Sequence, residues 1–191
     1  MTGAMKLLVR EAKRWDEEEG EYREFEGAEV EVSDEDVFMW NITLPGPEDS
    51  AYEGGVFYVE VKFTGSYPSE PPSIKFATKI YHPSIKLDGA DQGKLCKDAL
   101  KAVWKSTSKT RSMDIIEFLI TLLKDPPVDS PVEDAIAKIL NEDKDKFFEN
   151  AKIFTKKYAG GSDDEEEEEE DEDNDDEDND KGKPVKGGGK S

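Results

Sequence analysis

The residues most able to do covalent chemistry are the only cysteine and the only histidine of this 191-residue chain, Cys96 and His82. Both lie in the stretch YHPSIKLDGADQGKLC, which runs from Tyr81 to Cys96. A cysteine thiol has a pKa of about 8.5, so a few per cent of it is nucleophilic thiolate near neutral pH. A lone cysteine can equally be a small apolar core residue. Cys96 lies between Lys94 and Lys97 with no apolar run around it, and this setting favours the nucleophile.

His82 admits two roles. As the general base of a cysteine protease, its imidazole would take the thiol proton and would need an Asn or Asp to orient it. As a structural residue, it would instead hydrogen-bond within its own loop. A single cysteine excludes an internal disulfide, and no cluster of Cys and His exists to hold structural zinc. The sequence therefore predicts no metal site.

The elements that must position this stretch are indicated by hydrophobic periodicity. The pattern predicts an amphipathic helix from Met5 to about Glu18, ended by Gly20. Its apolar stripe consists of Leu8, Ala12 and Trp15.

Four short strands are predicted next, paired as an antiparallel meander. They lie in the segments EFEGAEVEV, VFMWNITL, GVFYVEVKF and PPSIKFATKI. The third segment shows the clearest alternation of apolar and polar side chains, with Phe57, Val59, Val61 and Phe63 on one face. Pro71 and Pro72 cannot donate ladder hydrogen bonds, so the fourth strand begins after them.

Periodicity lapses for roughly thirty residues between Ile80 and Met113, and long irregular segments in compact domains are usually functional. Three helices are predicted to follow. They are MDIIEFLITLL, ended by Asp125, Pro126 and Pro127; SPVEDAIAKIL, with Ser130 as N-cap and Pro131 at the first helical position; and DKDKFFENAKIFTKKYA. We therefore expect an α+β domain over residues 1–160, built from an N-terminal helix, a four-stranded antiparallel meander sheet, a long active-site loop and C-terminal helices.

Several of these stretches, in this order, resemble ubiquitin-conjugating enzymes, which receive a ubiquitin-like protein as a thioester and pass it on. The resemblance covers residues 5–159. LPGPEDSAYEGGVFYVEVKF is similar to the family's strand, loop, strand signature, and YPSEPPSIKF to its YP..PP.I.F segment. KIYHPS is similar to its His-Pro-Asn motif, and GKLCKDAL followed by Trp104 to its catalytic cysteine block. The end, NAKIFTKKYA, most resembles the type that serves HECT and RING-between-RING ligases.

The resemblance implies that Cys96 forms the thioester and that His82 is structural, hydrogen-bonding within the loop. Where the family has an asparagine, credited with stabilising the oxyanion or holding the active-site loop, this chain has Ser84. A hydroxyl is shorter than a carboxamide, and losing an oxyanion donor typically costs on the order of 10² to 10³ in rate. Transfer to lysine would then be slow, while transfer to a ligase cysteine, which needs less assistance, would survive.

Three further positions match the family. Asp98 matches an acidic residue that orients the incoming lysine, with a loop cap as the alternative. Ser130 matches a site on the facing loop, and because Pro131 follows it, Ser130 would suit a proline-directed kinase as well as an N-cap. Tyr81 matches a tyrosine near the site, which packing beneath the loop would explain equally well.

The connection before Cys96, SIKLDGADQGKL, is several residues longer than is usual in the family. Gly89 and Gly93 permit turns within it. It is interpreted either as a solvated insertion or as a source of negative charge, from Asp88 and Asp91, near the incoming lysine.

Ligase contacts are implied on the first helix and on two loops. The matching positions are Lys6 and Arg10 on the helix, Tyr67, Ser69 and Glu70 in the first loop, and Lys105, Ser106 and the residues to Ser108 in the second. Ser69 and Glu70 replace a phenylalanine that is common in the family. The usual hydrophobic anchor for HECT and RING ligases is therefore missing.

Charge is distributed unevenly along the chain. The formal net charge is −21, and residues 163–180 hold 16 of the 47 acids and no base, which leaves 31 acids and 22 bases in residues 1–162. Residues 161–191 lack apolar periodicity and are expected to form a disordered acidic tail. Its basic end carries Lys181, Lys183, Lys186 and Lys190. The tail is interpreted either as a solubilising extension or as a recruiter of a basic ligase surface or histones, and nucleic acid would be repelled.

The sequence contains neither a secretory signal nor a run of about 18 apolar residues, so we expect no membrane association and a cytoplasmic or nuclear location. The expected function is transfer of ubiquitin or a relative by way of Cys96. No cofactor is expected in this chain, since ATP is consumed by the activating enzyme upstream. The alternatives are a binding module that keeps the fold while its site has decayed, and an acidic histone-binding protein. The modifier, the ligase and the oligomeric state stay open.

Overall fold

The structure is a computed structural model, and it describes residues 3–15, 20–22, 25–104, 112–129 and 131–160. Some predictions lie outside the described residues. They are the site role and phosphorylation of Ser130, the ligase contacts of Lys105 and Ser106, and the disorder of the tail from residue 161.

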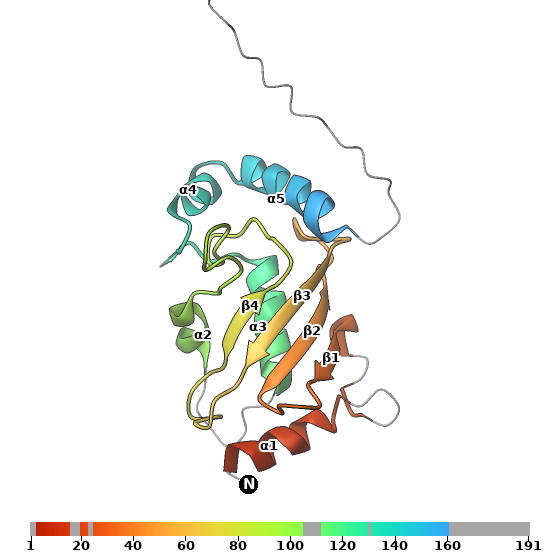
Figure 1. The fold of residues 1–191 in the computed structure, drawn as a ribbon. Coiled ribbons are helices and arrows are strands. Elements are labelled where there is room, and N and C mark those ends of the chain that lie inside the picture. Colours follow the sequence, from red (N-terminus) through yellow and green to blue (C-terminus); the bar gives the residue numbers. More distant parts are fainter. Residues whose placement is uncertain (1–2, 16–19, 23–24, 105–111, 130, 161–191) are drawn as a thin grey trace, which may run out of the picture.

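In the described ranges, one helix is followed by a sheet and then by four further helices (Figure 1). The helices are α1 (Gly3–Ala12), α2 (Lys97–Val103), α3 (Ser112–Lys124), α4 (Asp134–Glu142) and α5 (Lys144–Ala159). The strands are β1 (Glu29–Val32), β2 (Met39–Pro45), β3 (Val56–Lys62) and β4 (Ser73–Phe76), and a short 3-10 turn spans Phe25–Gly27.

The four strands form one antiparallel sheet in the order β1-β2-β3-β4, which confirms the predicted meander. Alternate residues of β3 point to opposite faces, so that Phe57, Val59 and Val61 are buried while Tyr58 and Glu60 are exposed. This is the alternation expected from the sequence, and it makes one face of the sheet apolar.

The apolar face of the sheet and α3 build the core (Figure 1). α3 is buried along one side through Ile115, Ile116, Leu119, Leu122 and Leu123, a spacing that gives a helix one continuous apolar stripe. At the two ends of the sheet lie α1 and the pair α4 and α5 (Figure 1). The predicted α+β architecture is thereby confirmed.

Two helix boundaries differ from the predictions. α1 ends at Ala12 rather than near Glu18, because the N–H groups of Arg14 and Trp15 bond to the carbonyls three residues back. This tighter turn lets the Trp15 indole N–H donate to Ser112 Oγ at 2.8 Å. α4 begins at Asp134 and its N-cap is Glu133, so the predictions of Ser130 as N-cap and Pro131 as first helical residue are wrong.

The interval between Ile80 and Met113 also departs from the prediction, because it contains a helix, α2. α2 has seven residues, of which only Leu100 is buried. Two turns with one apolar contact leave no periodic signal in the sequence.

Candidate active site

The long loop before Cys96 is held against the free edge of β4. The Phe76 N–H donates to the Gly93 carbonyl at 2.8 Å, and the Leu95 N–H donates to the Ile74 carbonyl at 3.1 Å. The loop is also closed on itself, since Gly93 N–H bonds to the Lys86 carbonyl at 2.7 Å. The end of the loop, from Gly93 to Leu95, is therefore bonded to β4, whereas residues 88–91 are exposed.

Gly93 is required where the loop meets β4. Its φ is +80°, and a Cβ at this position would lie 1.9 Å from the Phe76 carbonyl oxygen. Gly89 also has a positive φ, of +83°, but no atom lies within 4 Å of its Cβ position. Only Gly93 is fixed by both backbone conformation and close approach.

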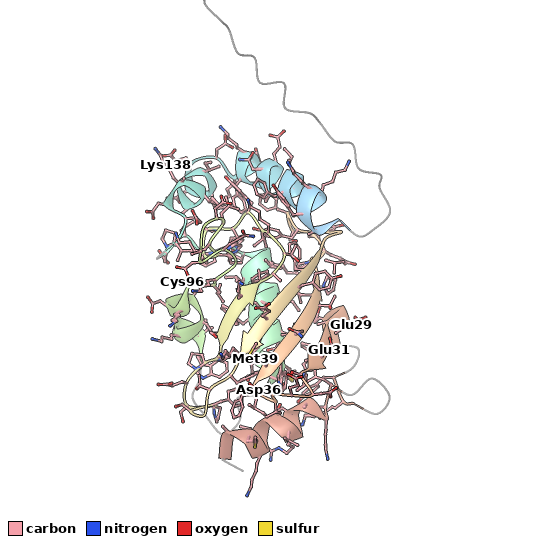
Figure 2. The ribbon with its side chains drawn as sticks, in the orientation of Figure 1. Glu29, Glu31, Asp36, Met39, Cys96 and Lys138 are labelled. Carbon is pink, nitrogen blue, oxygen red and sulfur yellow. The ribbon has the colours of Figure 1, made fainter. Side chains whose placement is uncertain are left out.

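Cys96 lies at the junction of this loop and α2, at the outer side of the molecule (Figure 2). Its side chain is partly exposed, and its N–H donates to the Ser84 carbonyl at 2.9 Å. The next helical turn carries Asp98, whose side chain is exposed. The structure thus brings Cys96, Ser84 and Asp98 into one region, with Cys96 partly exposed.

His82 is completely buried and has hydrogen bonds on both ring nitrogens. Nδ1 accepts from the Ser84 N–H at 3.0 Å, so the proton is assigned to Nε2, which donates to the Leu122 carbonyl at 3.1 Å. Burial lowers the pKa of His82 from about 6.5 to about 4. The imidazole therefore joins the loop to α3 in its neutral form. With neither nitrogen left over, this geometry favours the structural role and leaves no lone pair for a thiol proton.

The Ser84 side chain points into the protein. The residue is 1 % exposed, and its Oγ has no hydrogen-bond partner among the described residues. Its contact with Cys96 is made by the main chain, through the Ser84 carbonyl. An oxyanion role for the hydroxyl stays a prediction, and it would require the side chain to turn towards the thiol.

Tyr81 packs away from the thiol, against α5. Its ring lies 5.8 Å from that of Phe147 and 5.3 Å from that of Phe154, and its hydroxyl accepts from Asn150 Nδ2 at 3.4 Å. Its carbonyl accepts from the Tyr52 hydroxyl at 2.8 Å. These contacts favour the packing alternative that the sequence left open.

The segment that faces the active-site loop is tied to it by main-chain bonds. The N–H groups of Val132 and Glu133 both donate to the Pro83 carbonyl, at 2.9 and 3.1 Å. α4 begins only at Asp134 because Glu133, its N-cap, has φ −123° and ψ 83°, which is not a helical conformation. Lys86 Nζ adds a bond to the Val132 carbonyl at 2.7 Å and an ion pair with Glu133 at 3.4 Å.

The acidic residues of the loop are paired with lysines. Lys79 Nζ lies 2.6 Å from Asp88 Oδ1, and Lys94 Nζ donates to Asp91 Oδ1. The hydrogen bond from Lys94 holds the pKa of Asp91 below its usual value. Each carboxylate is therefore locally neutralised, which argues against the loop as a source of negative potential for an incoming lysine.

The described positions implied for ligases, on α1 and in the loop between β3 and β4, lie at the α1 end of the molecule (Figure 1). On α1, Lys6 and Arg10 are exposed, and in the first loop Ser69 and Glu70 are exposed. Tyr67 differs, because it is 3 % exposed and its ring packs against Phe63 at 4.8 Å. Burial, together with the charges of Glu11 and Asp114, raises the pKa of Tyr67. Tyr67 is therefore a support for the loop rather than a contact surface.

Two residues that were not given a role from the sequence hold this end together. Trp104 Nε1 donates to the Pro68 carbonyl at 2.9 Å, which fixes the first loop to the end of α2. Glu11 is 1 % exposed, and its Oε2 accepts from both the N–H and the hydroxyl of Ser112, at 3.3 and 3.1 Å. Glu11 is three residues after Leu8 and four before Trp15, so the helical stripe itself indicated a buried carboxylate. For Trp104 no periodic signal was available.

Within the described ranges, no group of three or more His, Cys, Asp and Glu side chains could hold a metal ion. In the same part of the chain, no helix has the length and apolar character needed to cross a bilayer.

Comparisons with known proteins agree with this geometry. The family model for ubiquitin-conjugating enzymes matches residues 8–155. A similar solved structure is that of a Plasmodium yoelii protein assigned as a ubiquitin conjugating enzyme. It has 31 % sequence identity and a TM-score of 0.69, and the match covers 84 % of this chain and 98 % of the other. A family match over most of the chain, with the α+β meander fold and a partly exposed cysteine before α2, shows that the chain belongs to the ubiquitin-conjugating enzyme family.

Proposed function

We propose that Cys96 accepts ubiquitin or a close relative from an activating enzyme as a thioester and passes it to a ligase cysteine or a substrate lysine. The observation that carries the proposal is the partly exposed Cys96 thiol at the junction of a tightly bonded loop and α2. A thiolate there can attack the thioester carbonyl held by the activating enzyme, and that enzyme's cysteine leaves as thiolate. No redox partner is needed, because one thioester is exchanged for another.

The second transfer depends on the attacking group. A ligase thiolate attacks the Cys96 thioester, forms a new thioester and releases the Cys96 thiolate. A lysine amine must instead lose a proton while it forms the isopeptide bond. We assign its orientation to Asp98, which is exposed in the first turn of α2, two residues after Cys96. Ser84 Oγ is buried. We therefore propose that transfer to a ligase cysteine is the faster reaction of this chain.

One specific observation favours a second candidate function, a binding module that keeps the fold but transfers poorly. The buried Ser84 hydroxyl lacks any hydrogen-bond partner among the described residues. Cys96 and Asp98 retain the exposure that transfer requires, and this supports the carrier over the binding module.

A loading assay tests the proposal. The full chain is incubated with activating enzyme, ATP and ubiquitin, and an adduct is expected that a thiol reductant removes. Because Cys96 is the only cysteine, a reductant-sensitive adduct identifies its site. Cys96→Ser is the matched control and should give an ester that resists the reductant. Absence of any adduct with ubiquitin and with related modifiers would contradict the carrier and leave the binding module.

The partners proposed are the activating enzyme, the carried modifier, and a HECT, RING or RING-between-RING ligase at the α1 end. The exposed surface there offers Lys6, Arg10, Ser69 and Glu70, which suits a ligase with a polar rather than an apolar contact. A basic ligase surface or histones are proposed for the acidic tail, and the cytoplasm or nucleus for the location.

A further inference from the structure

The last two turns of α5 form a basic surface on an acidic protein. Lys152, Lys156 and Lys157 are exposed, and no acid lies between residue 150 and the helix end. Residues 1–162 as a whole carry 31 acids against 22 bases. These three lysines, called the α5 lysine face below, are therefore a local exception to the charge of the domain.

The α5 lysine face has few partners of its own. Lys152 and Lys156 make no ion pair with any other described residue. Lys157 Nζ lies 5.6 Å from the centre of the Tyr158 ring, which is not a charge partner. One acid is close in sequence, Glu149, and it lies a turn before Lys152. Within the described residues, none of the three lysines is neutralised by an ion pair.

A hollow of about 610 Å³ adjoins the face, between the loop before β3 and the end of α5. Its lining includes Lys152, Thr155, Lys156 and Gly160 from the helix side and Glu53 from the loop side. Gly160 is bridged to Gly55 at the start of β3. The described chain therefore ends in the same hollow that two of the lysines line.

The chain that continues from Gly160 is the most acidic part of the sequence. Asp163 begins the run of 16 acids within residues 163–180, and it is three residues beyond Gly160, a span of about 10 Å at most. Along the helix, Lys156 lies about 6 Å and Lys152 about 12 Å back from Gly160. The start of the acidic run can thus reach the α5 lysine face without stretching, and the whole run is longer than α5.

We propose that the acidic run, residues 163–180, docks in cis on the α5 lysine face and the adjoining hollow. Single exposed ion pairs are weak. A short tether, however, gives an effective concentration in the millimolar range, and many carboxylates offer alternative pairings with the same three lysines. The contact holds the tail beside α5 until a more basic partner displaces it.

Zero-length crosslinking of the full chain tests this docking. A carbodiimide joins a carboxylate to an amine only where the two are in contact. Trypsin releases the acidic run as one peptide from Tyr158 to Lys181, because no lysine or arginine lies between them. We expect crosslinks from this peptide to Lys152 and Lys156 to be several-fold more abundant than crosslinks to Lys62 and Lys75. These two control lysines are exposed on the open face of the sheet. At 1 M salt, where the Debye length is about 3 Å, the preference should disappear.

A charge-matched pair of variants sharpens the test. K152E/K156E should lower the yield of crosslinks between the acidic run and α5, including those to Lys157, several-fold. K62E/K75E changes the net charge equally and should leave that yield unchanged. Chains labelled with heavy and light nitrogen are mixed before crosslinking to separate contacts within one molecule from contacts between two.

Three results would overturn the proposal. The first is an even distribution of crosslinks over all exposed lysines. The second is a preference for the basic end, Lys181 to Lys190, over α5. The third is a product dominated by mixed-isotope pairs, which would make the occupant of the α5 lysine face a second copy of the chain.

Discussion

At the residue scale, His82 makes the stability of the protein depend on pH. The unfolded chain has a histidine pKa near 6.5, whereas burial lowers the folded value to about 4. Between these values the unfolded chain binds a proton that the folded chain does not. The free energy of unfolding therefore rises with pH across this window. The contribution of His82 is fully present above about pH 6.5, and on the order of 3 kcal/mol of it is lost as pH falls to 4.

His82→Gln should remove this contribution and should lower the free energy of unfolding at pH 7.5 by about 1–3 kcal/mol, because buried partners at Ser84 and Leu122 are disturbed. Urea unfolding of both proteins at pH 5 and pH 7.5 measures the effect. The difference between the two proteins should be smaller at pH 5. Loss of thioester formation with unchanged stability would instead make His82 a participant in the chemistry.

A second prediction at the residue scale concerns Ser84 and whether the thioester is transferred to an amine or to a thiol. Ser84→Asn should speed discharge of the thioester to free lysine by up to about 10²-fold, because a carboxamide reaches further than a hydroxyl. Discharge to a small thiol should change little. Single-turnover release from preloaded protein measures both rates. An unchanged rate of discharge to lysine would show that serine at position 84 is not what makes transfer to lysine slow.

Ser84→Ala is the control for that substitution. Because Ser84 Oγ has no partner among the described residues, the free energy of unfolding should stay within about 0.5 kcal/mol of the wild type or rise. A larger loss would mean that the hydroxyl has a bonded partner in solution.

At the element scale, the active-site loop should respond to its two glycines differently. Gly89→Ala should cost about 1–2 kcal/mol, the ordinary cost of a positive φ. Gly93→Ala should cost about 3 kcal/mol or more and slow the loading of Cys96, because its Cβ collides with the Phe76 carbonyl. Urea midpoints and loading rates measure both variants, and equal losses would show that the loop is not held against β4.

The elements that the sequence predicted are those with a repeating apolar pattern. The strands and α3 and α5 follow from side chains that alternate or recur along one face, as Phe57, Val59 and Val61 do. α2 and the end of α1 were not predictable, because each depends on single contacts such as Leu100 and Trp15. The inward side chain of Ser84 was likewise not predictable, because it accompanies main-chain bonds of Ser84 to Cys96 and to the buried His82 ring that no local pattern contains.

At the scale of the whole molecule, the proposed docking makes the α5 lysine face compete with any basic partner for the tail. K152E/K156E removes the internal competitor and should raise binding of the full chain to a basic ligase or to histones a few-fold at low salt. K62E/K75E should not. If the two double variants bound the basic partner equally well, recruitment of that partner by the tail would not depend on the α5 lysine face.

Deletion from Ser162 should lower chain formation at low salt and have little effect at high salt, where the attraction is screened.

The double hydrogen bond at the Pro83 carbonyl has a consequence for sequence drift. Both donors are main-chain groups, those of Val132 and Glu133, so substitutions in this segment leave the bonds in place unless they introduce proline. The distance between the loop at Pro83 and the facing segment at Val132 and Glu133 therefore depends little on which side chains the facing segment carries. Side chains on the facing segment can change in size or charge over evolutionary time and alter which acceptors are used, while the frame around Cys96 keeps its shape.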